Sequence, residues 1–529
     1  MEYLVLLLSA LVLYVAYGLF WRLYLSPIAH IPGPRIAAAT RLYEAYYDLV
    51  LGGQYTFKIG ELHKEYGPVI RISPWEVHIH DPDFYGTIYA SATAQRKSDK
   101  YPFFTKFMGL DLCVFATVEH DLHRKRRAAL LPFFSKASVR RLQPVITERV
   151  EVLLSRAKEF RGTGRVLNAS CMFSALTNDV VNLYSFARCD YRLEDPNFDP
   201  WARDASLQGA NSANFMKHAP WINDVVKRLP DAMVAKILPA LATFTTQKRS
   251  SEAQVVKIIE GQNEGWKERE HPTIFHEVLS SKLPPEEKTV ARLADDAQMV
   301  VMAGTLTTAA ALEVISFWLL SQPDTLQKLK DELSAAIPVP TEASNVPLPT
   351  LEALPYLTAV IKEGMRLSYG VSTRLQRIDP NNTMTYTDKD TGKSWAIPAG
   401  TPVASTSVLI HRDESIYPNS ERFSPERWLD GRATALEKYL VSFCAGSRRC
   451  FGENLAYAEI YVGLAAIWRV WGSCDEEGKR LAWGEDDVGA LSLWETTKRD
   501  VEIESDQFVP AAQKGSKGIQ LMAWHPQAA

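Results

Sequence analysis

The sequence contains no linker rich in glycine and serine, no low-complexity tract and no internal repeat along its 529 residues. Length alone would suggest about three domains, but the absence of a visible boundary argues against such a division. The share of hydrophobic residues, 46%, is that of an ordinary globular protein with ample material for a core. We therefore expect one large domain, residues 41–529, behind an N-terminal appendage.

The chain also lacks an excess of charge of either sign. Its 59 Lys and Arg residues nearly balance 62 Asp and Glu residues, which leaves a net charge of −3. Nothing in this balance points to a polyanionic partner. We therefore expect no binding of nucleic acid.

Charge is missing altogether from Tyr3 to Trp21. As a helix this stretch would measure about 28 Å, close to the hydrocarbon thickness of a bilayer. A cleaved signal peptide would need a basic start and a small-residue cleavage site, and the sequence has neither. Positive charge follows the stretch instead, which places the rest of the chain in the cytosol. We predict a single-pass signal anchor in the endoplasmic reticulum membrane over residues 1–25, followed by a proline-rich hinge over residues 26–40.

Cysteine is scarce, with six residues, and none of them forms a CxxC pair. A cytosolic location disfavours disulfides. Zinc fits poorly, because the 11 histidines are scattered without ligand spacing around residues 444–450. The interpretation that remains is that one cysteine thiolate binds one cofactor.

Helical periodicity dominates the chain, most clearly over residues 139–161, 293–321 and 455–471. Extended segments are few: residues 68–81 predict a hairpin, and residues 383–405 predict strand, turn and strand. The proline-rich residues 336–350 predict a loop. The fold class expected is mainly α with small β-sheets.

One short segment concentrates residues that suit a cofactor, in the pattern F-x-x-G-x-R-x-C-x-G. Glycines allow tight turns and close approach to a flat ligand. Cys450 precedes the last predicted helix, whose free N–H groups favour a thiolate. Arg448 can neutralise a carboxylate, and Phe443 can shield the sulfur. The five residues are Phe443, Gly446, Arg448, Cys450 and Gly452.

This pattern resembles the haem-binding signature of the cytochrome P-450 family. The resemblance covers residues 30–525 and is greatest to fungal secondary-metabolism members, including the trichodiene-oxygenase type. It implies the cytochrome P-450 fold and haem b, with iron held by Cys450 as the axial thiolate ligand. Cys444 is then an inert neighbour. A lone buried cysteine would more often belong to the core.

Two further segments match the same family in order. Glu363 and Arg366 are spaced to share a helical face, which is usually a solvated pair. With Arg427, the resemblance makes them a buried triad that holds the cysteine loop. The resemblance also implies that His123 and Arg127 occupy the positions that contact the haem propionates.

Arg377 matches another propionate-binding position. Its match is less specific than that of the helical pair His123 and Arg127. The run from Arg124 to Arg126 lies, by resemblance, on the side approached by a reductase. A basic run is otherwise an ordinary solvated face.

The apolar stretch 293–321 contains the segment MAGTLTT, in which Ala303 and Thr307 share a helical face. A threonine here can simply bond to its own helix. The resemblance makes Thr307 the oxygen-activating hydroxyl and leaves room at Ala303, while Met302 is expected to point away. The family normally carries an acid before this threonine, where this chain has Leu306.

The resemblance implies a monooxygenase that takes electrons from an NADPH–cytochrome reductase and uses O2 to hydroxylate or epoxidise a small apolar molecule, of terpenoid or polyketide type. Two alternatives stay open: an oxidase that couples phenols, desaturates or rearranges without inserting oxygen, and a haem-binding sensor without turnover. Residues expected to line the substrate pocket are Phe103, Phe104, Phe107, Val114, Phe215, Met216, Ala303, Val371 and Leu491.

Overall fold

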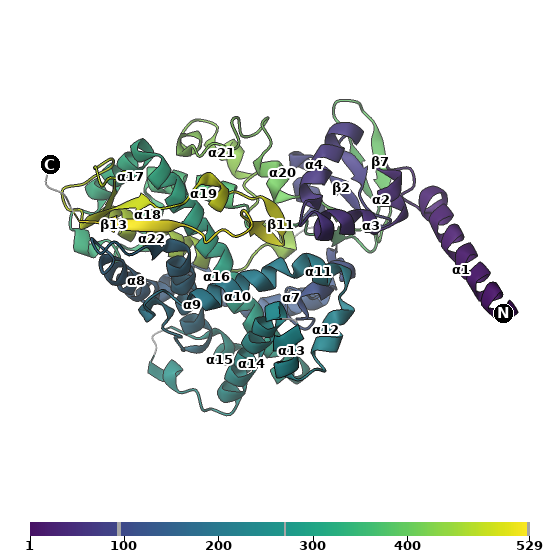
Figure 1. The fold of residues 1–529 in the computed structure, drawn as a ribbon, viewed down its shortest axis with the longest axis horizontal. Coiled ribbons are helices and arrows are strands. Elements are labelled where there is room, and N and C mark those ends of the chain that lie inside the picture. Colours follow the sequence, from purple (N-terminus) through teal and green to yellow (C-terminus); the bar gives the residue numbers. More distant parts are fainter. Residues whose placement is uncertain (92–96, 238, 269–270, 526–529) are drawn as a thin grey trace.

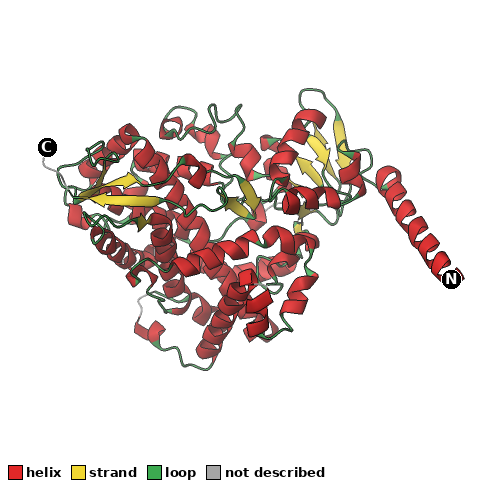
Figure 2. Ribbon diagram, viewed as in Figure 1, coloured by secondary structure: helices red, strands yellow, loops and turns green. Residues whose placement is uncertain are grey.

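The computed structural model describes residues 1–91, 97–237, 239–268 and 271–525. It confirms a mainly helical fold with small sheets (Figure 1, Figure 2). The helix α1 projects from one end of the body, beside the sheet that contains β2 (Figure 1). The β10–β13 sheet lies at the opposite end.

The α-helices are α1 (Glu2–Phe20), α2 (Arg35–Ala39), α3 (Leu42–Ala45), α4 (Tyr55–Tyr66), α5 (Tyr85–Ile88), α6 (Pro102–Thr105), α7 (His120–Leu130), α8 (Lys136–Lys158), α9 (Ala169–Phe186), α10 (Pro200–Asn211), α11 (Ala213–His218), α12 (Trp221–Val226), α13 (Asp231–Ile237), α14 (Pro239–Ile259), α15 (Ile274–Ser280), α16 (Val290–Ser321), α17 (Pro323–Ala336), α18 (Leu348–Glu352), α19 (Pro355–Ser368), α20 (Ser407–His411), α21 (Ala433–Glu437) and α22 (Glu453–Val470).

The strands are β1 (Val69–Arg71), β2 (Val77–Ile79), β3 (Asp99–Lys100), β4 (Leu167–Asn168), β5 (Arg377–Ile378), β6 (Met384–Thr387), β7 (Ser394–Ile397), β8 (Val403–Ala404), β9 (Trp471–Ser473), β10 (Gly489–Leu493), β11 (Ser505–Gln507), β12 (Val509–Ala511) and β13 (Gln520–Trp524). They form a five-stranded sheet in the order β1-β2-β8-β5-β3, a four-stranded sheet in the order β4-β13-β10-β9, and two hairpins, β6-β7 and β11-β12.

The sequence located the long helices within a few residues. The three helical predictions correspond to α8, α16 and α22, and the predicted early hairpin is β1 with β2, which pair antiparallel. Residues 383–405 form the β6–β7 hairpin as expected, but β8 leaves it to join the larger sheet. The expected loop over residues 336–350 contains a short 3-10 helix and the start of α18.

The helix α16 crosses the interior and packs against α9, α14, α19 and α22. Thr289 caps its start, because the side chain accepts a hydrogen bond from the Arg292 N–H. Gly304 permits close packing on α9, since a Cβ there would lie 2.9 Å from a methyl group of Val181. This packing sets the position of the residues that follow on the other face of α16.

Among the residues that the structure describes, two helices are long and apolar enough to cross a membrane. The window in Val290–Ser321 is 56% buried inside the domain, as expected of a core helix, whereas none of Glu2–Leu25 is buried. The N-terminal helix therefore fits a membrane anchor.

The segment that follows the anchor is packed onto the domain. Ile28 and Ile31 are buried against the sheet that contains β1. The Arg71 N–H donates to the Pro32 carbonyl at 2.7 Å, and its guanidinium donates to the Arg22 carbonyl at 2.8 Å. At Gly33, a Cβ would lie 2.4 Å from the Arg71 carbonyl oxygen. The predicted proline-rich hinge is thus held by the domain over residues 28–33.

Candidate active site

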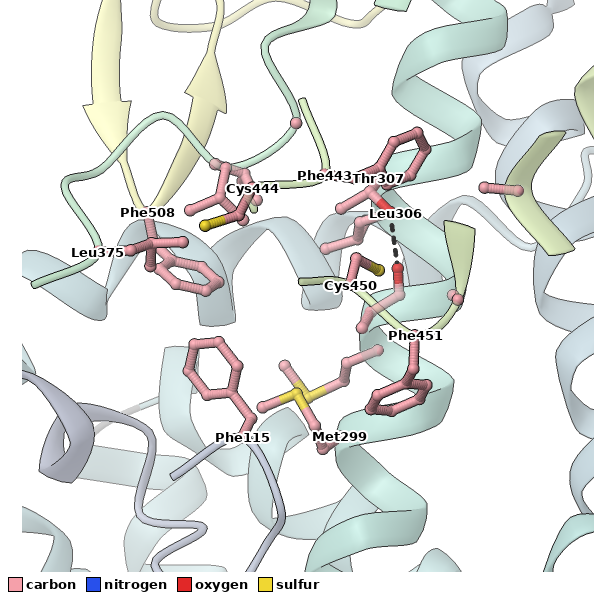
Figure 3. Close-up of a pocket in the computed structure, with 18 of the residues that line it drawn as sticks. Phe115, Met299, Leu306, Thr307, Leu375, Phe443, Cys444, Cys450, Phe451 and Phe508 are labelled. Atoms are coloured by element: carbon pink, nitrogen blue, oxygen red, sulfur yellow. Dashed lines mark hydrogen bonds between the residues drawn. The ribbon is translucent and has the colours of Figure 1, made fainter. Parts of the chain in front are cut away.

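A cavity of about 280 Å³ lies inside the domain, between α16 and the loop that precedes α22. Its walls also come from α7, from α9 and from the turn between β11 and β12. In Figure 3, Phe115 and Phe508 stand on one side of the space and Cys450, Leu306 and Thr307 on the other. Eight of the thirteen predicted site residues line it: His123, Arg127, Ala303, Thr307, Phe443, Arg448, Cys450 and Gly452.

Cys450 lies two residues before Gly452, the cap of α22, as the sequence predicted. Its side chain faces the cavity, and its N–H donates to the Phe443 carbonyl at 3.0 Å. Burial raises the pKa of the Cys450 thiol to about 11, although the Gly452 N–H and Arg127 lower it. The helix end therefore acts in the predicted direction, and desolvation outweighs it.

The two signature glycines have different structural roles. Gly446 has a φ of +73°, and a Cβ there would lie 2.0 Å from the Ala90 carbonyl oxygen. Gly452 has an ordinary φ of −78°, and a Cβ there would only touch the Cys450 sulfur at 3.7 Å. Gly446 therefore serves a tight turn, whereas Gly452 leaves space beside the thiol.

Positive charge gathers at one end of the cavity. Arg127 and Arg448 line it with Lys100, which sequence reasoning missed, and Arg377 lies beside Lys100 as its partner in the β3–β5 pairing. Arg448 donates to the carbonyls of Ser98, Thr117 and Val118. Within the described residues, none of these four cations pairs with a carboxylate.

The same charges act on His123. Burial first, and then Arg448, Lys100, Arg127 and Arg377, lower the pKa of His123 to about 2. Burial, Arg377 and Arg127 likewise lower the pKa of Arg448 to about 9. A cluster that disfavours its own positive charge favours an anionic group.

The predicted triad forms away from the cavity. Both side-chain oxygens of Glu363 accept from Arg366, at 2.8 and 3.0 Å, and Arg427 donates to Glu363 at 3.1 Å. Arg366 and Glu363 are fully buried, and Trp428 also donates to Glu363, at 2.9 Å. The pair of Glu363 and Arg366 that the spacing predicted is therefore part of a buried network and is not a solvated surface pair.

His411 connects this triad to the cysteine loop and was missed by sequence reasoning. Its Nδ1–H donates to the Arg366 carbonyl at 2.8 Å, and its Nε2 accepts from the Val441 N–H at 3.0 Å. Burial and Arg366 lower the pKa of His411 to about 3, so the ring is neutral in this tautomer. The only signal in the sequence was the place of this histidine in the short polar segment HRDE, residues 411–414.

On α16, Ala303, Leu306 and Thr307 all face the cavity. The Thr307 hydroxyl donates to the Ala303 carbonyl at 2.8 Å, so its oxygen stays free to accept (Figure 3). Met302 was expected to point away, but it also lines the cavity. The long, unbranched side chain reaches the wall from the flank of the helix.

The apolar walls follow the expectation in part. Phe107, Val114, Met216, Ala303 and Val371 line the cavity as predicted. Phe103 lies under the Arg41 guanidinium, Phe104 packs on Phe107, Phe215 is 46% exposed, and Leu491 belongs to a core strand. The wall residues that sequence reasoning missed include Met108, Phe115, Phe244, Met299, Leu375 and Phe508.

The comparisons with known proteins identify the family. The family model described as Cytochrome P450 matches residues 46–470. The chain is a cytochrome P450. It is 48% identical to the cytochrome P450 monooxygenase tpcC of Cochliobolus heterostrophus, over 98% of this chain and 96% of the relative. It is 43% identical to the cytochrome P450 monooxygenase astB of Talaromyces wortmannii, over 98% and 97%.

A third relative is the tryptophan 6-hydroxylase fscE of Fusarium equiseti, 37% identical over 94% of the P450 and 93% of the relative. These relatives support a monooxygenase of fungal secondary-metabolite biosynthesis. P450 monooxygenases use O2, a substrate and a redox partner.

Membership of the family implies a haem iron with a cysteine thiolate ligand. The residues around the cavity fit that group. A sulfur faces the space from one loop, a small residue opposes it on α16, and cations without carboxylate partners could neutralise two propionates.

Proposed function

We propose that this P450 hydroxylates or epoxidises a small apolar secondary metabolite, of terpenoid or polyketide type, in a biosynthetic sequence. The observation that carries the proposal is the cavity itself, which combines a thiol, a helix with a free hydroxyl oxygen and a wall of methionine and phenylalanine. Such walls hold an apolar molecule by dispersion and by removing it from water.

Cys450 would bind the iron of haem b, and Phe443 and Gly452 would flank the sulfur. Arg127, Arg377 and Arg448, with His123, would hold the propionates, while Glu363, Arg366 and Arg427 hold the loop through His411. The bound haem supplies reductive activation of O2, which thiolate donation promotes. Thr307 would hold and pass a proton at Oγ1, and Ala303 leaves space beside it.

The ligand assignment is tested by the reduced protein with carbon monoxide. The parent and Cys444→Ala should both show the red-shifted Soret band of thiolate coordination, and Cys450→Ala should lose it. A band that survives in Cys450→Ala, or that depends on Cys444, would contradict the assignment.

The apolar substrate class is tested by binding spectra of the haem-loaded protein. Terpenoid and aromatic polyketide scaffolds should perturb the Soret region at micromolar concentration. Met299→Lys or Phe508→Asp should abolish the perturbation and leave the carbon monoxide spectrum intact. Perturbation only by charged, polar compounds would contradict the proposed class.

The electron donor would be a membrane-bound NADPH–cytochrome reductase that docks at α7. Arg124 and Lys125 are exposed there, but Arg126 is not part of this surface, because it pairs with Glu287 at 2.7 Å and is largely buried. The basic surface expected over residues 124–126 therefore consists of Arg124 and Lys125 alone. Surface attraction of this kind is screened over about 8–10 Å.

Replacing Arg124 and Lys125 by Ala should slow reductase-driven reduction and weaken its salt dependence. The matched control replaces Lys514 and Lys517, two exposed lysines before β13, and should change neither. An unchanged rate and salt slope in the α7 double variant would mean that the run is an ordinary solvated face.

Residues 1–25 would span the endoplasmic reticulum membrane once and leave residues 41–529 in the cytosol. The supporting feature is the fully exposed apolar helix α1, with Arg22 and Arg35 on its domain side. Deletion of residues 1–25 should release the domain from membranes with its haem retained. Glycosylation of a site engineered into residues 250–270 would contradict the cytosolic placement.

One alternative has an observation in its favour. Leu306 occupies the position where the family normally has an acid, so that proton delivery beside Thr307 is altered. A reaction that removes electrons without inserting oxygen would tolerate this change. Incorporation of label from ¹⁸O2 into the product separates the two activities.

A further inference from the structure

One surface cluster takes no part in the proposed reaction. The indole of Trp75 is 39% exposed, and two guanidinium groups contact it. The Cζ of Arg22 lies 5.0 Å from the ring centroid, and the Cζ of Arg41 lies 4.5 Å from it. Arg22 follows α1 in the chain, whereas Arg41 precedes α3. Two like charges on one ring repel each other, so that the cluster favours an anion.

The described part of the chain supplies no such anion. Neither Arg22 nor Arg41 forms an ion pair there, and each guanidinium donates one hydrogen bond, to a carbonyl and to a hydroxyl respectively. Glu44 and Glu76, the nearest acids along the chain to this cluster, are buried and pair with other cations. A guanidinium has five N–H groups, so most of these donors are free for an external acceptor.

A buried arginine holds the parts of the cluster together. Arg71 is 2% exposed, and its guanidinium donates to the Arg22 carbonyl at 2.8 Å. It also donates to the carbonyls of the two residues before Trp75, at 3.3 and 2.7 Å. Arg41 packs on Phe103 at 3.6 Å from the ring centroid. The cluster is therefore positioned before a ligand arrives, which lowers the entropic cost of binding.

The cluster lies where the proposed membrane anchor ends. The charge-free stretch ends at Trp21, and Arg22 is the next residue. The helix α1 leaves the body beside α2 and the sheet that contains β2, and Trp75 lies in the turn between β1 and β2 (Figure 1). Tyr24, 60% exposed, adds a second ring near this level. Such rings are typical of the membrane–water interface, which is also the level of the lipid phosphates.

We propose that Arg22, Arg41 and Trp75 form a binding site for the headgroup of one anionic phospholipid. The inference rests on the proposed anchor, because it needs lipid at this depth. The two guanidinium forks hold the phosphate, whose geometry they match. The cytoplasmic leaflet supplies anionic lipid. Phosphatidylcholine, by contrast, brings a choline cation that two arginines repel.

The first test uses the haem-loaded full chain in a neutral detergent. Dioctanoyl phosphatidic acid and dioctanoyl phosphatidylcholine are added in turn, and native mass spectrometry counts the bound lipid. The parent should bind the acidic lipid at least about tenfold more tightly. Arg22→Gln with Arg41→Gln should remove this preference. Lys514→Gln with Lys517→Gln, which loses the same charge from exposed lysines before β13, is the control and should keep it.

Two further variants separate a built site from diffuse attraction. Arg22→Lys with Arg41→Lys keeps the charge and loses the forks, and Trp75→Leu keeps the charge and removes the ring that both guanidiniums contact. Each should weaken binding of the acidic lipid at least roughly threefold. Full binding in both variants means non-specific attraction and overturns the proposal. Equally tight binding of inorganic phosphate without lipid identifies a soluble ligand and also overturns it.

The second test places the full chain in nanodiscs of about four parts phosphatidylcholine to one part phosphatidic acid. Spin-labelled forms of the two lipids report which one the protein immobilises. The parent should immobilise phosphatidic acid preferentially, and Arg22→Gln with Arg41→Gln should immobilise both lipids equally. A parent that inserts and shows no preference overturns this proposal and leaves the anchor intact.

A parent that does not insert overturns the proposed anchor, and the detergent titration then decides the headgroup site. The carbon monoxide spectrum of each variant checks that haem is retained. If Arg41→Gln loses haem, Arg22→Gln alone takes the place of the double variant, and an unchanged lipid preference in it overturns the proposal.

Discussion

At the scale of single residues, the position before Thr307 departs most from the family pattern. Leu306 faces the cavity next to the Thr307 hydroxyl, whose proton is donated to the Ala303 carbonyl. A leucine can neither accept nor donate a proton, so that delivery near Thr307 depends on water and on other acids.

Two substitutions test this position. Thr307→Ala should raise the peroxide formed per NADPH, and Leu306→Glu should lower it, with haem retained in both. A tenfold change in the rate of either branch, peroxide release or product formation, corresponds to about 1.4 kcal/mol in its activation barrier. One proton donor can change a barrier by this amount. Peroxide formed per NADPH is measured together with product formation from the true substrate. If neither substitution changes the peroxide yield, Thr307 is a packing residue.

At the scale of elements, the cysteine loop depends on two supports that lie far apart in the sequence. On one side His411 joins the loop to α19, and on the other Gly446 turns against the carbonyls of residues 89 and 90. Both supports act on the backbone of the loop, the first through the His411 side chain, so the loss of either displaces the loop as a whole.

Gly446→Ala should lower the free energy of unfolding by about 3 kcal/mol, because it adds strain at a positive φ and a clash with the Ala90 carbonyl. Haem retention should fall with it. Gly431→Ala is the control, since no atom lies within 4 Å of a Cβ there. Denaturant unfolding of both variants checks the difference, and equal stabilities would contradict this account.

The elements that the sequence predicted well are those set by local periodicity, such as α16 and α22, and by a dense motif, such as the loop of Cys450. What it missed depends on contacts between distant segments. Phe508 reaches the cavity from the β11–β12 turn, whereas Leu491, which was expected to line the cavity, lies in β10 and pairs with Ala523 of β13. Arg126 looked like a surface charge because Glu287 lies 161 residues away.

At the scale of the whole molecule, buried neutral histidines link stability to pH. His411 has its pKa lowered to about 3 by burial and by Arg366, and its unfolded value is near 6.5. The unfolded chain therefore takes up a proton below pH 6.5 that the folded protein refuses. The contribution of this ring is complete above pH 6.5 and is lost as the pH falls toward 3.

The stability difference between the parent and His411→Gln isolates that contribution. It should be largest at pH 7 and should shrink below pH 6.5 by about 1.4 kcal/mol for each pH unit. Denaturant unfolding at pH 5.0, 6.0 and 7.5 measures it, on the haem-loaded protein. A difference that is constant over this range would mean that the pKa of the ring is the same in the folded and unfolded states.

The packing of the segment after α1 also determines how the protein sits at a surface. Since Ile28, Ile31 and Gly33 are packed against the β1 sheet, the connection between α1 and the domain is short and is not a loose tether. In a bilayer that α1 spans as proposed, a tilt that the bilayer thickness imposes on the helix would also turn the domain. The lipid composition would then set which face of the enzyme is turned toward dissolved partners and which toward the lipid.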